Sequence, residues 1–529
     1  MRSSRHWLAM TSGALGFFVL VAVLYAAAHH AFAGDSDGAT VVLQGQSMGS
    51  GNLTLHGWAL SLDSFWTIDA VVYTLVELVS GVRGMLLYLV PALIAAAVIL
   101  VGVFLARDGR RGVSAVAAGV TVVVLLGLPN HELANVFLRG PLHVGTALLC
   151  LVAFAGLRSG RLGWGWVAGV LCLAAGVLGD FQTAVLGVGS VFAAGLVAAL
   201  RTRAWRAGIP ELSASAAALV VAALVRAVSE AVGTFSVNSS HPVASWSRIV
   251  TNLRHLPSLA ANLLGVGKGQ LGTGGTPAAL QLVHVIGVVV VAGGLIAGIV
   301  AMVRGVIRGG TSSQKPTAAW RLEDLLVLAV LADLVVFLAL TTSDDPGFLR
   351  YLTAAVIFGT VLGARWVGRL VAAVPSSRFA RRGALAVGLI AVAALTAGFG
   401  FTLSARVPRQ QSSQLDRFLE ARQLDVGVGD YWSASITTVS TNGEVIVRPV
   451  IATPHGRVVR YQRQSEKAWY TDQPFQFLVY NTAKRWGGVD ATSASLTFGP
   501  AARTYTVGPY RVLVWSHPLS VSAKGWPID

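Results

Sequence analysis

The chain alternates between long apolar runs and short gaps that carry most of its basic residues. The first run extends from about Leu8 to Ala31, and about ten more follow, ending with one at about Ala384 to Leu403. Each run approaches the roughly 20 apolar residues that a helix needs to cross the hydrocarbon core of a bilayer. The pattern predicts a polytopic α-helical membrane protein with about eleven spans.

The basic clusters fall in alternate gaps, for example at "RDGRR" (residues 107–111) and "RTRAWR" (residues 201–206). Lys and Arg concentrate in cytoplasmic loops. This rule predicts a cytoplasmic N-terminus in the plasma (inner) membrane and four outer loops, at residues 34–82, 129–142, 233–277 and 342–349. The first run is longer than a signal-peptide core, so we expect a retained helix, although "AFAG" also fits a cleavage site.

The composition changes near residue 404, where the apolar runs end. Stretches such as "EVIVRPVIA", "FQFLVY" and "YRVLVW" alternate between apolar and polar residues and are bounded by turn formers. This period of two is typical of β-strands. We therefore expect a transmembrane domain at residues 1–403, followed by an extracytoplasmic soluble domain, mainly β or α/β, at residues 404–529.

Composition excludes two other classes of protein. Hydrophobic residues make up 54% of the 529 positions and charged residues only 12%, against roughly 25% charged in soluble domains. The net charge of +16 comes mostly from the gaps between apolar runs, so it indicates membrane topology rather than nucleic-acid binding. Cys150 and Cys172 both lie in apolar runs, and the sequence shows no metal-ligand spacing of cysteines.

Ionisable residues also gather in the outer loops and at the adjoining helix ends, which predicts a polar cavity that opens outward. Such residues are costly near the membrane and usually functional. Asp344 and Asp345 in "SDDPG" fit an ordinary turn better. The remaining candidates are Asp35, Asp37, His56, Asp63, Asp69, His131, Glu132, Arg139, His143, Asp180 and Arg350.

This set of side chains suits one type of reaction in particular. A carboxylate can deprotonate an acceptor hydroxyl as a general base, and arginine can hold a phosphate leaving group through paired hydrogen bonds. Together they favour glycosyl transfer from a phosphate-linked donor. Paired carboxylates also serve glycosidases, but hydrolysis does not require a scaffold of membrane helices, whereas a lipid-linked donor does.

The order of these features resembles the GT-C superfamily of integral membrane glycosyltransferases. A first helix is followed by an outer loop that opens with "GDSDGATVVLQGQSMGSGN" and then by an amphipathic segment. In that family a D-x-D or D-D motif in the first outer loop carries the catalytic carboxylate, which corresponds here to Asp35-Ser36-Asp37. "FLRYL", with Arg350, is similar to the phosphate-contacting region of some members.

The resemblance implies a polyprenyl-phosphate-sugar donor and inverting transfer to a hydroxyl on a cell-envelope glycan, lipid or protein, as in cell wall biogenesis. It identifies no subfamily, sugar or acceptor. We expect Asp37 as general base and Asp35 as a second catalytic carboxylate; alternatively, Ser36 or Asp37 only caps a helix. A divalent cation, Mg²⁺ or Mn²⁺, held by Asp35 and Asp37 is left open. The expected substrate-binding residues are Arg350, His131, Glu132, His143, Asp180, His56 and Asp69.

Two alternatives to a transferase remain at this point. A transporter or flippase of lipid-linked glycans would need polar groups near the bilayer midplane and two related halves, whereas the polar residues here lie at the outer helix ends. A non-catalytic envelope assembly protein would present the tail domain outside. In that tail, Tyr431, Trp432, Trp469 and Tyr470 form either a sugar-stacking surface or part of a small core.

Overall fold

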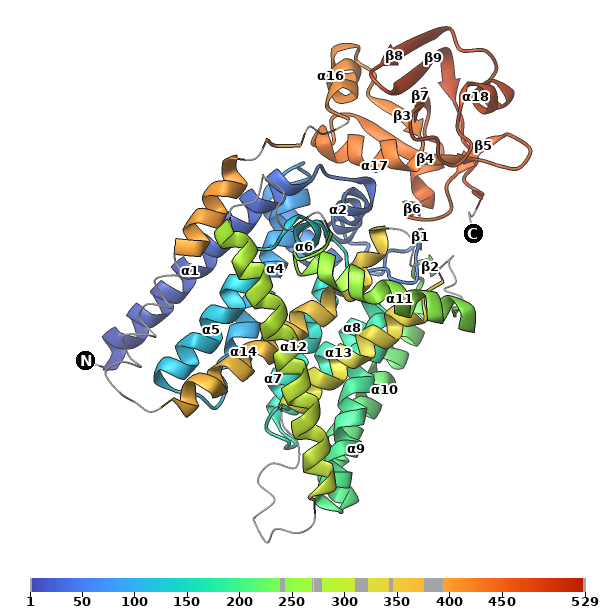
Figure 1. The fold of residues 1–529 in the computed structure, drawn as a ribbon. Helices are drawn as coiled ribbons and strands as arrows, with labels where there is room; N and C mark the ends of the chain where they lie inside the picture. The colour runs from blue at the N-terminus through green and yellow to red at the C-terminus, as the bar shows by residue number, and fades with distance from the viewer. Residues whose placement is uncertain are drawn as a thin grey trace. The chain divides into compact units, whose positions relative to one another are not determined.

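The structure is a computed structural model, and it describes residues 2–237, 243–268, 270, 278–309, 322–341, 346–374, 393–404, 406–408, 410 and 412–526. The chain forms two compact units (Figure 1). Unit 1 comprises residues 1–31, 91–224 and 241–407, and unit 2 comprises residues 32–90, 225–240 and 408–529. We describe each unit separately.

Unit 1 is built from helices. Its elements are α1 (Arg2–Ala31), most of α4 (Leu86–Arg107), α5 (Gly112–Gly127), α6 (His131–Phe137), α7 (Val144–Leu157), α8 (Trp164–Gly179), the π-helix η1 (Ala184–Gly189), α9 (Ser190–Thr202), η2 (Trp205–Gly208), most of α10 (Ile209–Val232), α11 (Trp246–Leu263), α12 (Ala278–Ile307), α13 (Leu322–Leu338), η3 (Pro346–Leu352), α14 (Thr353–Ala373) and a helix at Ala393–Ser404.

Helix α14 lies at the centre of this bundle and packs against α5, α12 and α13. Its approach to α12 depends on two glycines. A Cβ atom added at Gly294 would lie 2.5 Å from the Cα of Gly363, so neither helix tolerates a side chain at this crossing. Small residues that allow close backbone approach are typical of helix contacts in membranes.

Several helices have the length and composition of membrane spans, as the apolar runs predicted. Among the described residues, 6 helices are long and apolar enough to cross a membrane, or up to 7 if α5 and α6, which bend by 91° at their junction, count as one span. Helices α7, α8 and Ala393–Ser404 are apolar but shorter. The predicted count of about eleven is therefore not confirmed.

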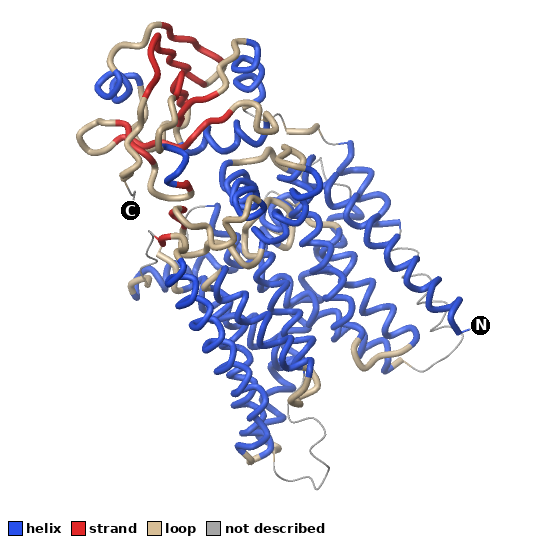
Figure 2. Tube along the Cα trace, turned by 180° about the vertical axis from the view of Figure 1, so that it is seen from behind, coloured by secondary structure: helices blue, strands red, loops and turns tan. Residues whose placement is uncertain are grey.

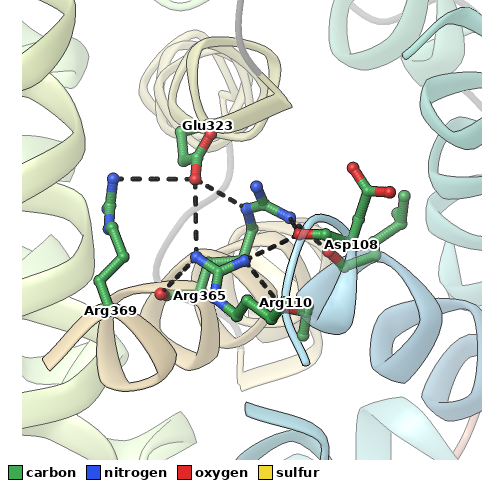
Figure 3. A network of polar contacts seen from close by, with 7 residues as sticks. Asp108, Arg110, Glu323, Arg365 and Arg369 are labelled. Atoms are coloured by element: carbon green, nitrogen blue, oxygen red, sulfur yellow. Dashed lines mark hydrogen bonds and ion pairs between the residues drawn. The ribbon is translucent and has the colours of Figure 1, made fainter. Parts of the chain in front are cut away.

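A network of charged side chains joins three parts of unit 1 (Figure 3). The Nε of Arg365 in α14 donates to Glu323 Oε1 at the start of α13 over 2.9 Å, and its Nη1 donates to the carbonyl oxygen of Leu105 in α4. Arg369 and Arg110 approach the same Glu323 oxygen at 3.7 and 3.9 Å. Three guanidinium groups thus share one buried carboxylate, which fixes the α4–α5 turn to α13 and α14.

Unit 2 contains a six-stranded sheet with the strand order β5-β4-β3-β7-β9-β8. The strands are β3 (Val426–Gly429), β4 (Ile446–Ala452), β5 (Val458–Arg460), β7 (Phe475–Asn481), β8 (Arg503–Val507) and β9 (Tyr510–Leu519). Strand β3 runs parallel to β4 and β7, and the other pairs are antiparallel. The predicted C-terminal sheet region is confirmed, and it is of the α/β type.

Helices cover both faces of this sheet. Helices α16 (Ser413–Ala421) and α17 (Tyr431–Ser440) supply Leu415, Leu419 and Ala434 to a core that includes Phe477 and Val479 of β7. On the other face, α18 (Ala491–Phe498) packs Ala494 against a second core. Successive residues of a strand point to opposite faces, which is why the single apolar strand β7 contributes to both cores.

A second, smaller sheet joins distant parts of the chain within unit 2. Strand β1 (Trp58–Leu60) pairs in parallel with β2 (Ser236–Val237) and antiparallel with β6 (Ser465–Glu466). In Figure 2 these short red strands are separate from the red strands of the six-stranded sheet. Helices α2 (Ser36–Gly49) and α3 (Asp69–Ser80) complete the unit.

Candidate functional site

Asp35 and Asp37 lie at the start of α2 and face different neighbours. Asp35 is the N-cap, and its Oδ1 accepts from the Gly38 N–H over 2.9 Å. Asp37 is in the first helical turn, half-buried, and accepts a hydrogen bond from the Tyr431 hydroxyl of α17. The expectation that Ser36 or Asp37 caps the helix is wrong, because the helix already begins at Ser36 and Asp35 is its N-cap.

Tyr431 reaches Asp37 because α2 packs against α17 within unit 2. Thr40, one helical turn beyond Asp37, donates to the Ser435 hydroxyl over 3.2 Å, and Ser435 is one turn beyond Tyr431. Burial and the nearby Asp37 charge raise the pKa of Tyr431 well above its ordinary value. The phenol therefore stays protonated and acts as a hydrogen-bond donor, which orients the carboxylate.

The start of α17 is itself fixed to the sheet by Asp430. This buried residue follows β3 directly, and its Oδ2 accepts from the Ser433 hydroxyl over 2.8 Å and from the Asn481 N–H over 2.9 Å. Burial raises the pKa of Asp430 to about 6. Tyr431 is thus held on a helix whose first turn is tied to the ends of both β3 and β7.

Helix α3 adds further acidic groups on the face turned toward α2. Asp69, Tyr73 and Glu77, spaced by four residues, are all buried. Burial raises the pKa of Tyr73 well above its ordinary value, and the nearby carboxyl groups of Asp69, Asp35 and Glu77 raise it further. The two helices approach closely at Gly45, where an added Cβ would lie 3.1 Å from Glu77 Oε2. Asp35 thus faces this group, whereas Asp37 faces Tyr431.

Unit 1 contains a second group, centred on a buried His143–Asp180 pair. The Nδ1 of His143 lies 2.7 Å from Asp180 Oδ2, which also accepts from the Thr146 hydroxyl. The Gln182 N–H donates to the other Asp180 oxygen over 2.9 Å. His143 has φ +65°, a backbone conformation that residues with side chains rarely adopt, and the pair holds it there.

This pair continues into a longer polar network. Gln182 Nε2 donates to Asp333 Oδ1 of α13 over 3.1 Å, and Asp333 Oδ2 accepts from the Ala355 N–H over 2.7 Å. On the other side, the ring of Tyr351 lies 4.8 Å from that of His143. The Arg350 guanidinium donates to the Tyr351 hydroxyl over 3.3 Å and lies over the Tyr351 ring.

The nine predicted site residues therefore separate into groups. Asp35, Asp37 and Asp69 lie together in unit 2, and His143, Asp180 and Arg350 lie along one network in unit 1. His56 is exposed in unit 2 beside Gly233, while His131 and Glu132 begin α6, the first exposed and the second half-buried. Asp344 and Asp345 lie outside the described residues.

Several residues of these groups were not predicted from the sequence. Glu77 and Tyr73 could have been found from their four-residue spacing after Asp69, and Asp333 from its position as a lone acid in an apolar run. Tyr431 had no such signal for its role. It is 394 residues away from Asp37, and no local pattern links the two.

The four tail aromatics do not form a single surface. Trp469 contacts Trp58 and the Arg448 guanidinium, and the buried Tyr470 donates to the carbonyl of Pro449. Tyr431 and Trp432 instead contact each other, and Tyr431 also contacts Tyr461 and Trp486. Trp469 and Tyr470 thus serve the packing of unit 2, and Tyr431 and Trp432 belong to a different cluster.

Comparison with known proteins gives a fold but no sequence family. No family model matches the sequence, and no curated protein matches it significantly. The structure is similar to that of ArnT from Cupriavidus metallidurans in the apo state, with a TM-score of 0.56 and 14% identity over 96% of this chain and 98% of that chain.

A second structure of ArnT from the same organism, bound to undecaprenyl phosphate, aligns with a TM-score of 0.51 and 14% identity over 95% of this chain and 98% of that one. The oligosaccharyltransferase of Archaeoglobus fulgidus in complex with Zn and sulfate aligns with a TM-score of only 0.44 and 12% identity, over 89% of this chain and 66% of that one. The similarity to ArnT extends over the helices and the C-terminal sheet alike. The chain therefore shares the fold of ArnT.

Proposed function

We propose that this protein is a glycosyltransferase that moves a sugar from a polyprenyl-phosphate carrier to a hydroxyl of a cell-envelope glycan, lipid or protein. One observation carries the proposal: in a chain with the fold of ArnT, Asp37 lies in the first turn of α2 with its carboxylate oriented by Tyr431. The undecaprenyl phosphate bound by ArnT is a carrier of the proposed class.

In the proposed reaction, the acceptor oxygen attacks the anomeric carbon of the donor sugar. The bond between that carbon and the phosphate oxygen breaks, and polyprenyl phosphate leaves with the bonding electrons. The acceptor proton passes to the carboxylate of Asp37, which acts as general base. A single displacement of this kind inverts the anomeric configuration. Asp35, which caps the same helix, is the second carboxylate assigned to this step.

Arg350 is proposed to bind the donor phosphate. Its guanidinium is supported by the rings of Tyr351 and Phe348, at 5.0 and 5.8 Å, and arginine suits phosphate because its planar donors match two oxygens at once. The buried His143–Asp180 pair packs against Tyr351 and positions it. His131, Glu132, His56 and Asp69 remain proposed substrate contacts.

A divalent cation, Mg²⁺ or Mn²⁺, is a further proposal. Asp35 and Asp37 would hold it, because carboxylate oxygens are the ligands that these hard ions prefer, and the cation would supply charge stabilisation for the departing phosphate. We expect a chelator to abolish transfer and added Mg²⁺ or Mn²⁺ to restore it. Full activity after exhaustive chelation would exclude the cation.

The topology completes the proposal. We add the shorter apolar helices α7, α8 and Ala393–Ser404 to the 6 or 7 longer candidates. With the 17-residue helix α13 as a further span, the total is about eleven. We propose that the N-terminus lies in the cytoplasm. The start of α2 and residues 404–529 would then lie outside the plasma (inner) membrane.

The direct test is transfer by the purified full chain in lipid nanodiscs, with polyprenyl-phosphate-linked sugars as donors and a membrane glycan extract as acceptor. General-base catalysis contributes about 100-fold to 10,000-fold, so we expect Asp37→Asn to lose at least 100-fold in rate while its thermal unfolding is unchanged. Undiminished transfer by both Asp37→Asn and Asp35→Asn would overturn the assignment.

A further inference from the structure

We propose that the acceptor is a carbohydrate bound at the carboxyl ends of β3 and β7, with sugar rings stacked on Trp432 and Trp486. This inference rests on the proposed function for the role of the ligand as acceptor, but the binding site itself is argued from unit 2 alone. Tyr431, Trp432, Tyr461 and Trp486 are called the aromatic cluster below.

The sheet topology marks this place first. Strand β3 lies between β4 and β7 in the sheet. From β3 the chain continues through α17 to β4, on one side of β3. From β7 it continues through α18 and β8 to β9, which lies on the opposite side. The strand order therefore reverses between β3 and β7. In open α/β sheets, ligands bind outside the carboxyl ends of the strands at such a switch point.

The aromatic cluster lies at these carboxyl ends. Asp430 and Tyr431 follow β3 directly, and Trp486 lies in the segment that follows β7. The ring of Tyr431 lies 5.1 Å from Trp432, 5.4 Å from Tyr461 and 5.5 Å from Trp486, and Tyr461 lies 4.9 Å from Trp486. The rings form one continuous group built from three separate segments.

Exposure within the aromatic cluster is graded. Tyr431 and Tyr461 are buried, with 4% and 5% of their surfaces exposed, Trp486 is half-buried, and Trp432 is 42% exposed. The two tyrosines form a floor, and the two tryptophans supply the accessible aromatic surface.

This arrangement suits a sugar better than a wholly apolar ligand. One face of a pyranose presents C–H groups with partial positive charge, which lie favourably against the negative face of an aromatic ring, while its hydroxyls need polar partners. Binding sites commonly combine aromatic walls with a few placed polar groups. Here a carboxylate, Asp37, accepts a hydrogen bond from the same Tyr431 whose ring belongs to the aromatic cluster.

The shared tyrosine links binding to chemistry. The Tyr431 ring contacts Trp432 and Trp486, and its hydroxyl donates to Asp37, the proposed general base. An acceptor bound to the aromatic cluster and the proposed base therefore contact the same tyrosine, and both belong to unit 2. Binding on the aromatic cluster would thereby bring acceptor hydroxyls to Asp37, and specificity for the acceptor would reside in α17 and in the segments that carry Tyr461 and Trp486.

The test uses the full chain in nanodiscs and a glycan array of mannose, glucose, galactose and arabinose oligosaccharides as the probe. We expect the wild type to bind at least one of these classes, and Trp432→Ala and Trp486→Ala to weaken that binding at least tenfold. Tyr505→Ala is the matched control. Tyr505 is also half-buried, and its ring lies 5.2 Å from that of Phe418, but it lies on the edge strand β8. Its removal should therefore leave binding unchanged.

Several outcomes would overturn the inference: no binding by the wild type, equal binding by Trp432→Ala, or equal loss in Tyr505→Ala. Because Trp432 is exposed, its variant should keep the thermal unfolding of the wild type, and it decides the test if Trp486→Ala fails to fold. Asp37→Asn should still bind the array. Binding by Asp37→Asn with undiminished transfer would refute the proposed base and leave the binding site standing.

Discussion

At the scale of single residues, the two acids of the "DSD" motif have different surroundings. Asp35 caps α2, and its charge is one of those that raise the pKa of Tyr73 in α3. Asp37 instead accepts a hydrogen bond from Tyr431 of α17. The sequence places them two positions apart and already favours Asp37 as the general base. Their neighbours assign Asp37 to the side of the C-terminal sheet and therefore to the proposed acceptor.

Tyr431 is a positioning residue in this account, and Tyr431→Phe tests it. The substitution keeps the ring in the aromatic cluster and removes only the hydroxyl that donates to Asp37. We expect kcat to fall about tenfold, because a hydrogen bond to a charged group contributes roughly 1.5–3 kcal/mol. The acid limb of the pH–rate profile should also move to higher pH.

Binding of glycan should survive in Tyr431→Phe, since the aromatic ring remains. Loss of glycan binding together with an unchanged pH profile would mean that Tyr431 has only a packing role. Tyr431→Ala, which removes both the hydroxyl and the ring, should lose transfer and glycan binding together.

Glu77 gives a separate prediction about stability. Among the described residues neither of its carboxyl oxygens has a hydrogen-bond partner, and burial raises its pKa from 4.5 to about 8. Between pH 4.5 and about pH 8 the carboxyl group of Glu77 keeps its proton in the folded state but loses it in the unfolded state. The free energy of unfolding should therefore fall as the pH rises from 4.5 to 8.

Glu77→Gln removes this ionisation. We expect the variant to match the wild type below pH 4.5 and to unfold at a higher temperature above pH 8, as measured by thermal unfolding across the pH range. A destabilised variant at high pH would show instead that the carboxylate is bound and functional in its charged form.

At the scale of elements, the charged network around Glu323 holds the ends of three segments of unit 1 together. Arg365, Arg369 and Arg110 share this one carboxylate (Figure 3). Removing one partner of a buried ion pair leaves uncompensated charge, which costs about 3–5 kcal/mol. The network thus gives charged groups at helix ends a structural role distinct from catalysis.

Glu323→Gln should lower the stability of the purified protein by about 3 kcal/mol, since it leaves three arginines without their common acid. Glu230→Gln is the matched control. Glu230 pairs with Arg226 on the surface of α10 and its side chain is 57% exposed, so its loss should change stability by less than about 1 kcal/mol. Equal effects of the two substitutions would refute a structural role for the network.

At the scale of the whole molecule, local patterns predicted the classes of element but not their long-range contacts. Apolar runs predicted the helices, and period-two alternation predicted strands such as β7 and β9. The count of about eleven spans is not confirmed among the described residues, because helices α5, α7 and α8 contain only 16, 14 and 16 residues. The sequence of an apolar run does not show where its helix ends.

The candidate site was predictable only in part for the same reason. Asp37 could be predicted from its motif, and Asp180 from its position between two apolar runs. The bond between Tyr431 and Asp37 joins positions 394 residues apart, and β1, β2 and β6 pair from three separate segments. Such contacts depend on tertiary packing, which no periodicity or spacing in the sequence encodes.

The central claim is that this chain consumes a polyprenyl-phosphate-linked sugar with Asp37 as the base. The measurement that tests it most directly compares donor lipids and envelope glycans, by mass spectrometry, in cells that lack the protein and in cells complemented with wild type or Asp37→Asn. We predict that a polyprenyl-phosphate sugar accumulates and a glycan loses that sugar, and that wild type but not Asp37→Asn reverses both changes. Restoration by Asp37→Asn, or unchanged lipids and glycans in cells that lack the protein, would contradict the account.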